Sequence, residues 1–199
     1  MNWEIILTSV AIFFAGLFIG SFLNNLIYKI PRKISIFNPY SLCFTCNKKI
    51  SIIYNFPVLA YLINKSTCKN CGKKIPVQNI LIEFLNGLMY VLVYINFVIQ
   101  PESAPRVISI ISGLILVSIL IVISFIDWEF MIIPNIIVLP FTIAGLVLSI
   151  TRITLKNPRN WWFPLAYSAG AFVFMMIIHL IYPKGMGMGD VKLALMLGA

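Results

Sequence analysis

Apolar residues occur in long runs along this chain, separated by short segments that contain polar residues, glycine or proline. A helix needs roughly 20 apolar residues to span the hydrocarbon core of a bilayer. Five runs approach or reach this length, and a sixth begins close to Asp190. We therefore expect transmembrane helices over residues 5–28, 79–99, 106–126, 136–151 and 163–182, followed by an incomplete helix from Asp190 onward.

The pattern predicts an all-α integral membrane protein with about six transmembrane helices. Hydrophobic residues make up 60% of the chain and charged residues only 11%, which excludes an ordinary soluble domain. We divide the chain into a first helix (1–28), one long polar segment (29–78) and a membrane domain (79–199). Only nine residues follow Asp190. They span about 13 Å as a helix, against a core of roughly 30 Å, so we expect the membrane domain to be truncated.

Positive charge is concentrated in the long polar segment. The formal net charge is +9, and nine of the fifteen Lys and Arg residues lie between Lys29 and Lys74. Such a cluster occurs in nucleic-acid-binding proteins, but in a multi-pass protein the positive-inside rule explains it. We therefore expect no nucleic acid partner. The segment is expected in the cytoplasm and the N-terminus outside, although three basic residues in 152–159 then lie outside.

Four cysteines form two CxxC pairs in this segment, with 21 residues between the pairs. The pairs are Cys43 with Cys46 and Cys68 with Cys71. Each is followed by a residue suited to a positive φ, Asn47 or Gly72, so that backbone N–H groups can point at the thiolates. The spacing is typical of a structural zinc site with four thiolates in a zinc-ribbon-like loop. Disulfides or redox pairs are the alternative, and a reducing cytoplasm argues against them.

The chain has only two aspartates, Asp127 and Asp190, and both lie at the boundary of an apolar run. Two helices separate them, so they share one membrane face, which our orientation makes cytoplasmic. Carboxylates at such positions tend to be functional, although each alone could be an interfacial helix-end residue. Held close together, one carboxylate keeps a proton while the other activates water against a peptide carbonyl. Gly187 and Gly189 would let a substrate backbone or a neighbouring helix approach Asp190.

Four further features leave alternatives open. Glu83 near the start of the second helix either lies favourably in the helix dipole or receives a basic substrate segment. Lys192 either extends to lipid headgroups or tunes Asp190. The single histidine, His179, is interpreted as a packed or hydrogen-bonded residue. The GxxxG motif of Gly16 and Gly20 indicates close helix packing more often than a homodimer.

Taken together, these motifs resemble the type IV prepilin leader peptidase family along nearly the whole chain. The resemblance rests on GLFIGSFLNNLIYKIP (16–31), the two CxxC pairs with PVLAY (57–61) between them, Glu83, the segment from Asp127 to Pro134, and GMGDVKL (187–193). Two positions depart from the family pattern. Asn135 stands where an aspartate is common, and Phe44 where a proline is common.

The resemblance implies a bacterial inner-membrane GxGD aspartyl endopeptidase. It would remove the short basic leader from prepilins or pseudopilins at the cytoplasmic face, with Asp127 and Asp190 as catalytic residues. Many members also methylate the new N-terminus with S-adenosylmethionine, and that activity rests on the resemblance alone. Two alternatives are a preflagellin-type peptidase and a non-enzymatic assembly protein that docks partners through its zinc loop.

Overall fold

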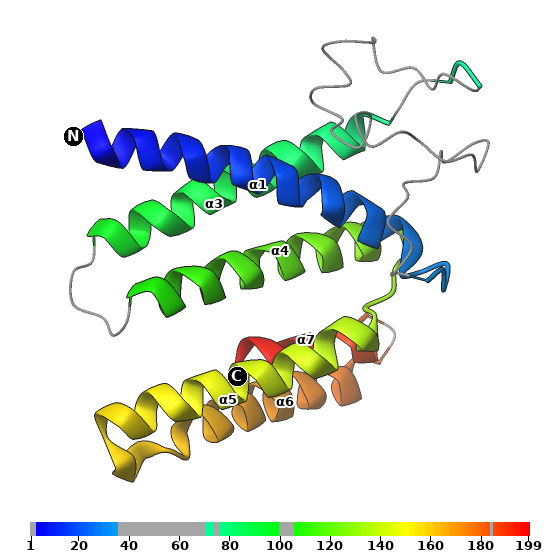
Figure 1. Ribbon diagram of the computed structural model, residues 1–199. Coiled ribbons are helices and arrows are strands. Elements are labelled where there is room, and N and C mark those ends of the chain that lie inside the picture. The colour runs from blue at the N-terminus through cyan, green and yellow to red at the C-terminus, as the bar shows by residue number, and fades with distance from the viewer. Residues whose placement is uncertain (1–2, 36–70, 74–75, 100–105, 184) are drawn as a thin grey trace. The chain divides into compact units, whose positions relative to one another are not determined.

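A computed structural model describes residues 3–35, 71–73, 76–99, 106–183 and 185–199 (Figure 1). Over these residues the regular elements are all helices. They are α1 (Trp3–Lys29), α3 (Val77–Ile99), α4 (Arg106–Phe130), α5 (Asn135–Lys156), the short 3-10 helix η2 (Pro158–Asn160), α6 (Phe163–Ile181) and α7 (Met188–Leu197). The prediction of an all-helical protein is confirmed for this part of the chain.

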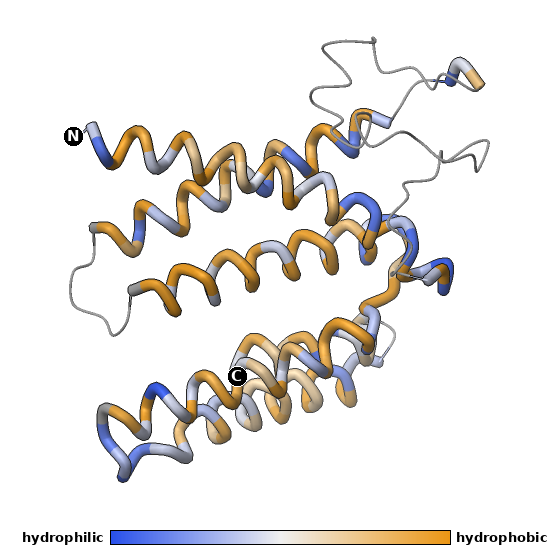
Figure 2. Tube along the Cα trace, in the orientation of Figure 1, coloured by the Kyte–Doolittle hydropathy of each residue, from blue (hydrophilic) through white to orange (hydrophobic). Residues whose placement is uncertain are grey.

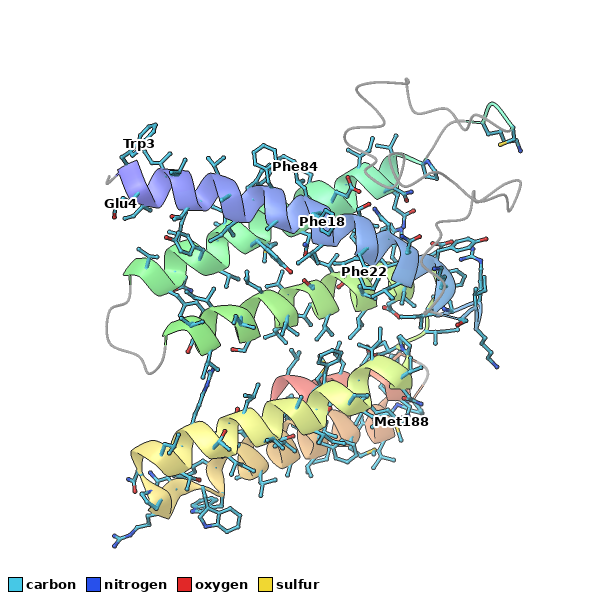
Figure 3. The ribbon with its side chains drawn as sticks, in the orientation of Figure 1. Trp3, Glu4, Phe18, Phe22, Phe84 and Met188 are labelled. Carbon is cyan, nitrogen blue, oxygen red and sulfur yellow. The ribbon has the colours of Figure 1, made fainter. Side chains whose placement is uncertain are left out.

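Five of these helices are long and apolar enough to cross a membrane. The candidate spans are Trp3–Lys29, Val77–Val98, Val107–Phe130, Asn135–Leu155 and Pro158–Ile181. Figure 2 shows that hydrophobic residues dominate these helices along most of their length. Large apolar side chains such as Phe18, Phe22 and Phe84 are exposed on α1 and α3 (Figure 3). Such surfaces suit a hydrocarbon solvent, because lipid tails leave no penalty for exposed apolar groups.

The chain forms two compact units, which divide between Phe125 and Ile126. The first unit contains α1, α3 and most of α4, and the second contains the end of α4 with α5, η2, α6 and α7. The division predicted from the sequence has its boundaries after residues 28 and 78 instead. Most of the polar segment between them, 29–78, lies outside the described residues, so that division stays a prediction.

Glycines let α1 and α3 approach each other closely in the first unit. A Cβ built on Gly16 would lie 2.7 Å from the Cα of Gly87, and one on Gly20 would lie 2.7 Å from the Cα of Glu83. The GxxxG motif therefore packs one helix of this chain against another, as the sequence indicated.

A buried chain of hydrogen bonds crosses the same unit. Asn86 of α3 donates from Nδ2 to the carbonyl oxygen of Gly16 in α1, at 2.8 Å. Ser118 of α4 donates to Oδ1 of Asn86 at 3.3 Å and lies 2.8 Å from the hydroxyl of Tyr90. The side chains of α3 therefore join both neighbouring helices.

One helix boundary near the predicted site was wrong in the sequence interpretation. We expected a break over residues 127–135, but α4 continues to Phe130 and the break is only 131–134. The reason is that Pro134 restricts only the residue directly before it, Ile133. Asp127 consequently lies within the last turn of α4. The other helices begin and end within a few residues of the prediction, except that α5 extends from 151 to Lys156.

Candidate active site

Asp127 is positioned by the last turn of α4. Its side chain is exposed, and its carboxylate makes no hydrogen bond with the described part of the chain. Its backbone carbonyl accepts a hydrogen bond from the N–H of Met131 at 2.8 Å. Met131 has a φ of 53°, the left-handed conformation that commonly ends a helix. The chain therefore turns away directly after the helix and leaves the Asp127 carboxylate accessible.

Asp190 is positioned by the first turn of α7, where it is the third helical residue. Its Oδ2 accepts a hydrogen bond from the backbone N–H of Gly187 at 3.1 Å. Its own backbone N–H donates to the carbonyl oxygen of Gly187 at 3.1 Å. The first bond is the carboxylate half of a capping box, in which the third helical residue reaches back to the residue before the helix. This arrangement restrains the Asp190 carboxylate at the N-terminal end of α7.

The chain's single histidine bonds to the glycine-rich segment that precedes Asp190. His179 lies near the end of α6, and its Nδ1 is 2.8 Å from the carbonyl oxygen of Met186. Because a carbonyl oxygen only accepts, Nδ1 carries the hydrogen in this contact. The interpretation of His179 as a hydrogen-bonded residue is confirmed, and its partner is the loop that leads to α7.

Two contacts join the start of α7 to the segment that follows Asp127. A Cβ built on Gly189 would lie 2.9 Å from the Cβ of Ile133, so that only glycine allows this approach. The Nζ of Lys192 donates to Oδ1 of Asn135 at 3.0 Å. Sequence reasoning had connected Lys192 with lipid or with Asp190. It missed Asn135, which is 57 residues away in the chain.

Helix pairing explains how these distant segments meet. Asp127 precedes α5 and Asp190 follows α6, while α5, η2 and α6 pack together as a helical hairpin. α7 packs against both helices of this hairpin, and Ser168 of α6 donates to the carbonyl oxygen of Leu195 at 2.8 Å. Met188, the first residue of α7, marks the end at which the two segments meet (Figure 3). The second unit thus presents two carboxyl groups at one end, the group types needed for acid–base hydrolysis of an amide.

Glu83 belongs to the first unit, and only 1% of its surface is exposed. It is the seventh residue of α3, because that helix begins at Val77. The helix dipole acts mainly on the first turn, so the dipole gives a weaker account of Glu83 than the sequence suggested. A role in binding substrate stays a prediction.

Three of the predicted zinc ligands, Cys43, Cys46 and Cys68, lie outside the described residues. Cys71 is described and is followed by Gly72 with a φ of 69°. The positive φ expected directly after a CxxC pair is therefore present at Gly72. Over the described ranges alone, no three His, Cys, Asp or Glu side chains gather as a metal site.

Known families match the chain in two blocks. The model of the bacterial peptidase A24 N-terminal domain matches residues 14–97, and that of the type IV leader peptidase family matches residues 114–199. The second block contains both aspartates. No solved structure matches the chain at a significant level.

Several curated proteins named prepilin leader peptidase/N-methyltransferase are similar to the chain. The protein of Bacillus subtilis (strain 168) is 31% identical over 190 residues, which cover 94% of this chain and 71% of the relative. That of Myxococcus xanthus (strain DK1622) is 31% identical over 97% of this chain and 56% of the relative. That of Klebsiella pneumoniae is 29% identical, over 94% of this chain and 82% of the relative.

Proposed function

The chain belongs to the type IV leader peptidase family, and from this membership we propose that it is a membrane aspartyl endopeptidase that cleaves the short basic leader from prepilins or pseudopilins. The observation that carries the proposal is the meeting of two aspartate-bearing segments at one end of the α5–α6 hairpin. Asp127 lies in the last turn of α4 and Asp190 in the first turn of α7. Both residues lie in the block that matches the peptidase family.

In the proposed mechanism, one aspartate is protonated while the other accepts a proton from the attacking water. The protonated aspartate donates its proton to the carbonyl oxygen of the scissile bond, and the aspartate that took a proton from water then gives that proton to the leaving amine. When the C–N bond breaks and the carbonyl re-forms, the proton on its oxygen returns to the first aspartate. The bond from Gly187 N–H to Asp190 occupies Oδ2 only, which leaves Oδ1 available for water or substrate. Asp127 is exposed at the end of its helix, so a peptide can approach it.

The two glycines before Asp190 have different surroundings. Ile133 fills the space beside Gly189, which favours the helix-approach alternative for that residue. A Cβ built on Gly187 would meet Oδ2 of Asp190 at 3.6 Å, an ordinary contact distance. We propose that the substrate backbone passes Gly187, close to the carboxylate. Gly189 and Glu83 also remain proposed substrate-binding residues.

The zinc site is a second part of the proposal. Cys43, Cys46, Cys68 and Cys71 are proposed to hold one structural zinc ion, which would fold the polar segment without entering the chemistry. The turn at Gly72 fits this role. We expect close to one equivalent of zinc in purified, reduced protein, and less than half an equivalent would contradict a four-cysteine site.

Methyl transfer and orientation complete the proposal. The relatives' names include an N-methyltransferase, so we propose S-adenosylmethionine as a cosubstrate, to be tested by mass spectrometry of the mature N-terminus. We place the protein in the bacterial inner membrane with its N-terminus outside and both aspartates at the cytoplasmic face. Cysteines that react with impermeant reagents added outside intact cells would contradict this orientation. The sixth transmembrane helix, which α7 would begin, also remains a proposal.

Conservative substitutions test the catalytic assignment. Asp127→Asn and Asp190→Asn should each reduce cleavage of a co-expressed prepilin by at least about a hundredfold, because each removes an acid–base group. Glu129→Gln is the matched control, since Glu129 is an exposed carboxylate in the same turn of α4 as Asp127. We expect it to retain cleavage. Retained cleavage in either aspartate variant would refute the aspartyl mechanism, and loss in the control would show that the assay responds to charge alone.

A further inference from the structure

The hydrogen bond between Lys192 and Asn135 connects the two segments that bear the proposed catalytic residues. Lys192 lies two residues after Asp190, and Asn135 is the first residue of α5, directly after Pro134. Nζ of Lys192 lies 3.0 Å from Oδ1 of Asn135. A lysine ammonium is a strong donor, and its bond to an amide oxygen is charge-assisted.

The position of Lys192 on α7 shows how it acts. Residues two apart on an α-helix point to nearly opposite sides, about 200° apart at 3.6 residues per turn. Lys192 and Asp190 therefore project in different directions from α7. The ammonium of Lys192 bonds to Asn135. Lys192 therefore affects Asp190 indirectly, by fixing where α7 lies relative to the start of α5.

A second contact on the same helical turn restrains the same movement. Gly189 lies against Ile133 so closely that a Cβ on it would be 2.9 Å from the Cβ of Ile133. Ile133 and Asn135 flank Pro134, whose φ of −74° is fixed by its ring. The N-terminal part of α7 is thus attached at two points, Gly189 and Lys192, on either side of Asp190 in the sequence. Both points contact the stiff segment around Pro134.

We infer that Lys192 and Asn135 are positioning residues that set the distance between the Asp190 and Asp127 segments. The inference rests on the proposed function, because it assigns these residues to the same hydrolytic site. Catalysis by two groups depends steeply on their placement, and an error of about 1 Å can cost roughly a hundredfold in rate. One bond between the segments is therefore enough to affect kcat.

The experiment uses the full chain in nanodiscs, with cleavage of a prepilin and hydrogen exchange measured in parallel. Lys192→Met and Asn135→Leu should each lower kcat at least about tenfold and change KM less than about twofold. The double variant should lose little more than either single variant, because both remove one bond. Lys192→Arg and Asn135→Asp keep a donor and an acceptor, so they should restore most of kcat. Arg159→Met is the control, because it removes a positive charge from η2, beyond the other end of α5.

Hydrogen exchange separates this inference from the proposed function. Amides of residues 190–194, whose N–H groups donate to Gly187 or within α7, should exchange several times faster in Lys192→Met and Asn135→Leu than in the parent, and should exchange at the parent rate in Asn135→Asp. Unchanged exchange, or kinetic losses that add in the double variant, would overturn the inference and leave Lys192 a lipid-facing residue. If the parent chain cleaves no prepilin, the proposed function fails, while the exchange rates still decide whether the bond holds α7.

Discussion

The close approach of α1 and α3 predicts that Gly20 tolerates no side chain. A Cβ on Gly20 would lie 2.7 Å from the Cα of Glu83 and 3.3 Å from its carbonyl oxygen. Ordinary contacts begin at 3.4 Å, so Gly20→Ala must push the two helices apart by about 0.7 Å. The atoms that it meets belong to the backbone of a helix, which cannot move aside as a side chain can. Overpacking of this kind costs about 1–3 kcal/mol.

A matched variant removes the effect of helix propensity from this measurement. Alanine is favoured over glycine in a helix interior by about 0.8–1 kcal/mol, a gain that Gly20→Ala and Gly170→Ala share. Gly170 lies within α6, and a Cβ on it would meet nothing within 4 Å. The difference between the two variants therefore reports the α1–α3 contact. We expect Gly170→Ala to be slightly stabilised and Gly20→Ala to be less stable than it by about 1–3 kcal/mol.

The assay is reversible unfolding of the full chain in mixed micelles with increasing SDS, followed by circular dichroism. Gly20→Val should extend the loss, since two more methyl groups enter the same contact, whereas Gly170→Val should be less stable than Gly170→Ala only by the small difference in helix propensity between valine and alanine. The reasoning would be refuted if Gly20→Ala were as stable as Gly170→Ala. That outcome would mean that α1 and α3 are separated in the membrane by more than the structure shows.

Three further predictions concern other contacts. A double-mutant cycle of Tyr90→Phe and Ser118→Ala should give a coupling energy of about 0.6 kcal/mol, at most roughly 1.7, measured by the same unfolding assay; zero coupling would contradict the 2.8 Å contact between the two hydroxyls. Gly187→Ala should keep the parent's helicity, because its Cβ meets Oδ2 of Asp190 at an ordinary 3.6 Å. It should nevertheless lower kcat/KM at least about tenfold by obstructing the substrate, and full activity would remove Gly187 from the substrate path. Met131→Gly should raise the unfolding free energy by up to about 1 kcal/mol, since it relieves a left-handed conformation that costs about 1–2 kcal/mol but adds chain entropy; a stability below that of the parent would show that the Met131 side chain packs.

The apolar runs predicted the transmembrane helices because hydrophobic length is a local property of the sequence. The predicted helix ends were less accurate where a helix ends in a backbone conformation that the residue type does not indicate. Met131 ends α4 in a left-handed conformation with a φ of 53°, a position usually taken by glycine or asparagine. Nothing in the sequence marks it, so the predicted break began four residues too early.

The site shows a similar division between local and distant information. Two lone aspartates in an apolar chain are visible in the sequence, and so is the glycine-rich approach to Asp190. The partner of Lys192 is not visible, because the α5–α6 hairpin brings Asn135 to it across 57 residues. In the same way, GxxxG indicated a close helix contact without identifying Gly87 and Glu83 as the residues that α1 meets.

The glycine contact between α1 and α3 also bears on which changes of length and sequence the polar segment between them tolerates. α1 ends at Lys29 and α3 begins at Val77, so helix packing rather than the connecting chain fixes the two ends of this segment. The entropy of closing such a loop grows only with the logarithm of its length, and doubling the length costs about 0.6 kcal/mol. Insertions, exchanged domains or an added reporter between these helices should therefore cost the first unit little stability, which makes this connection a suitable place for engineered fusions.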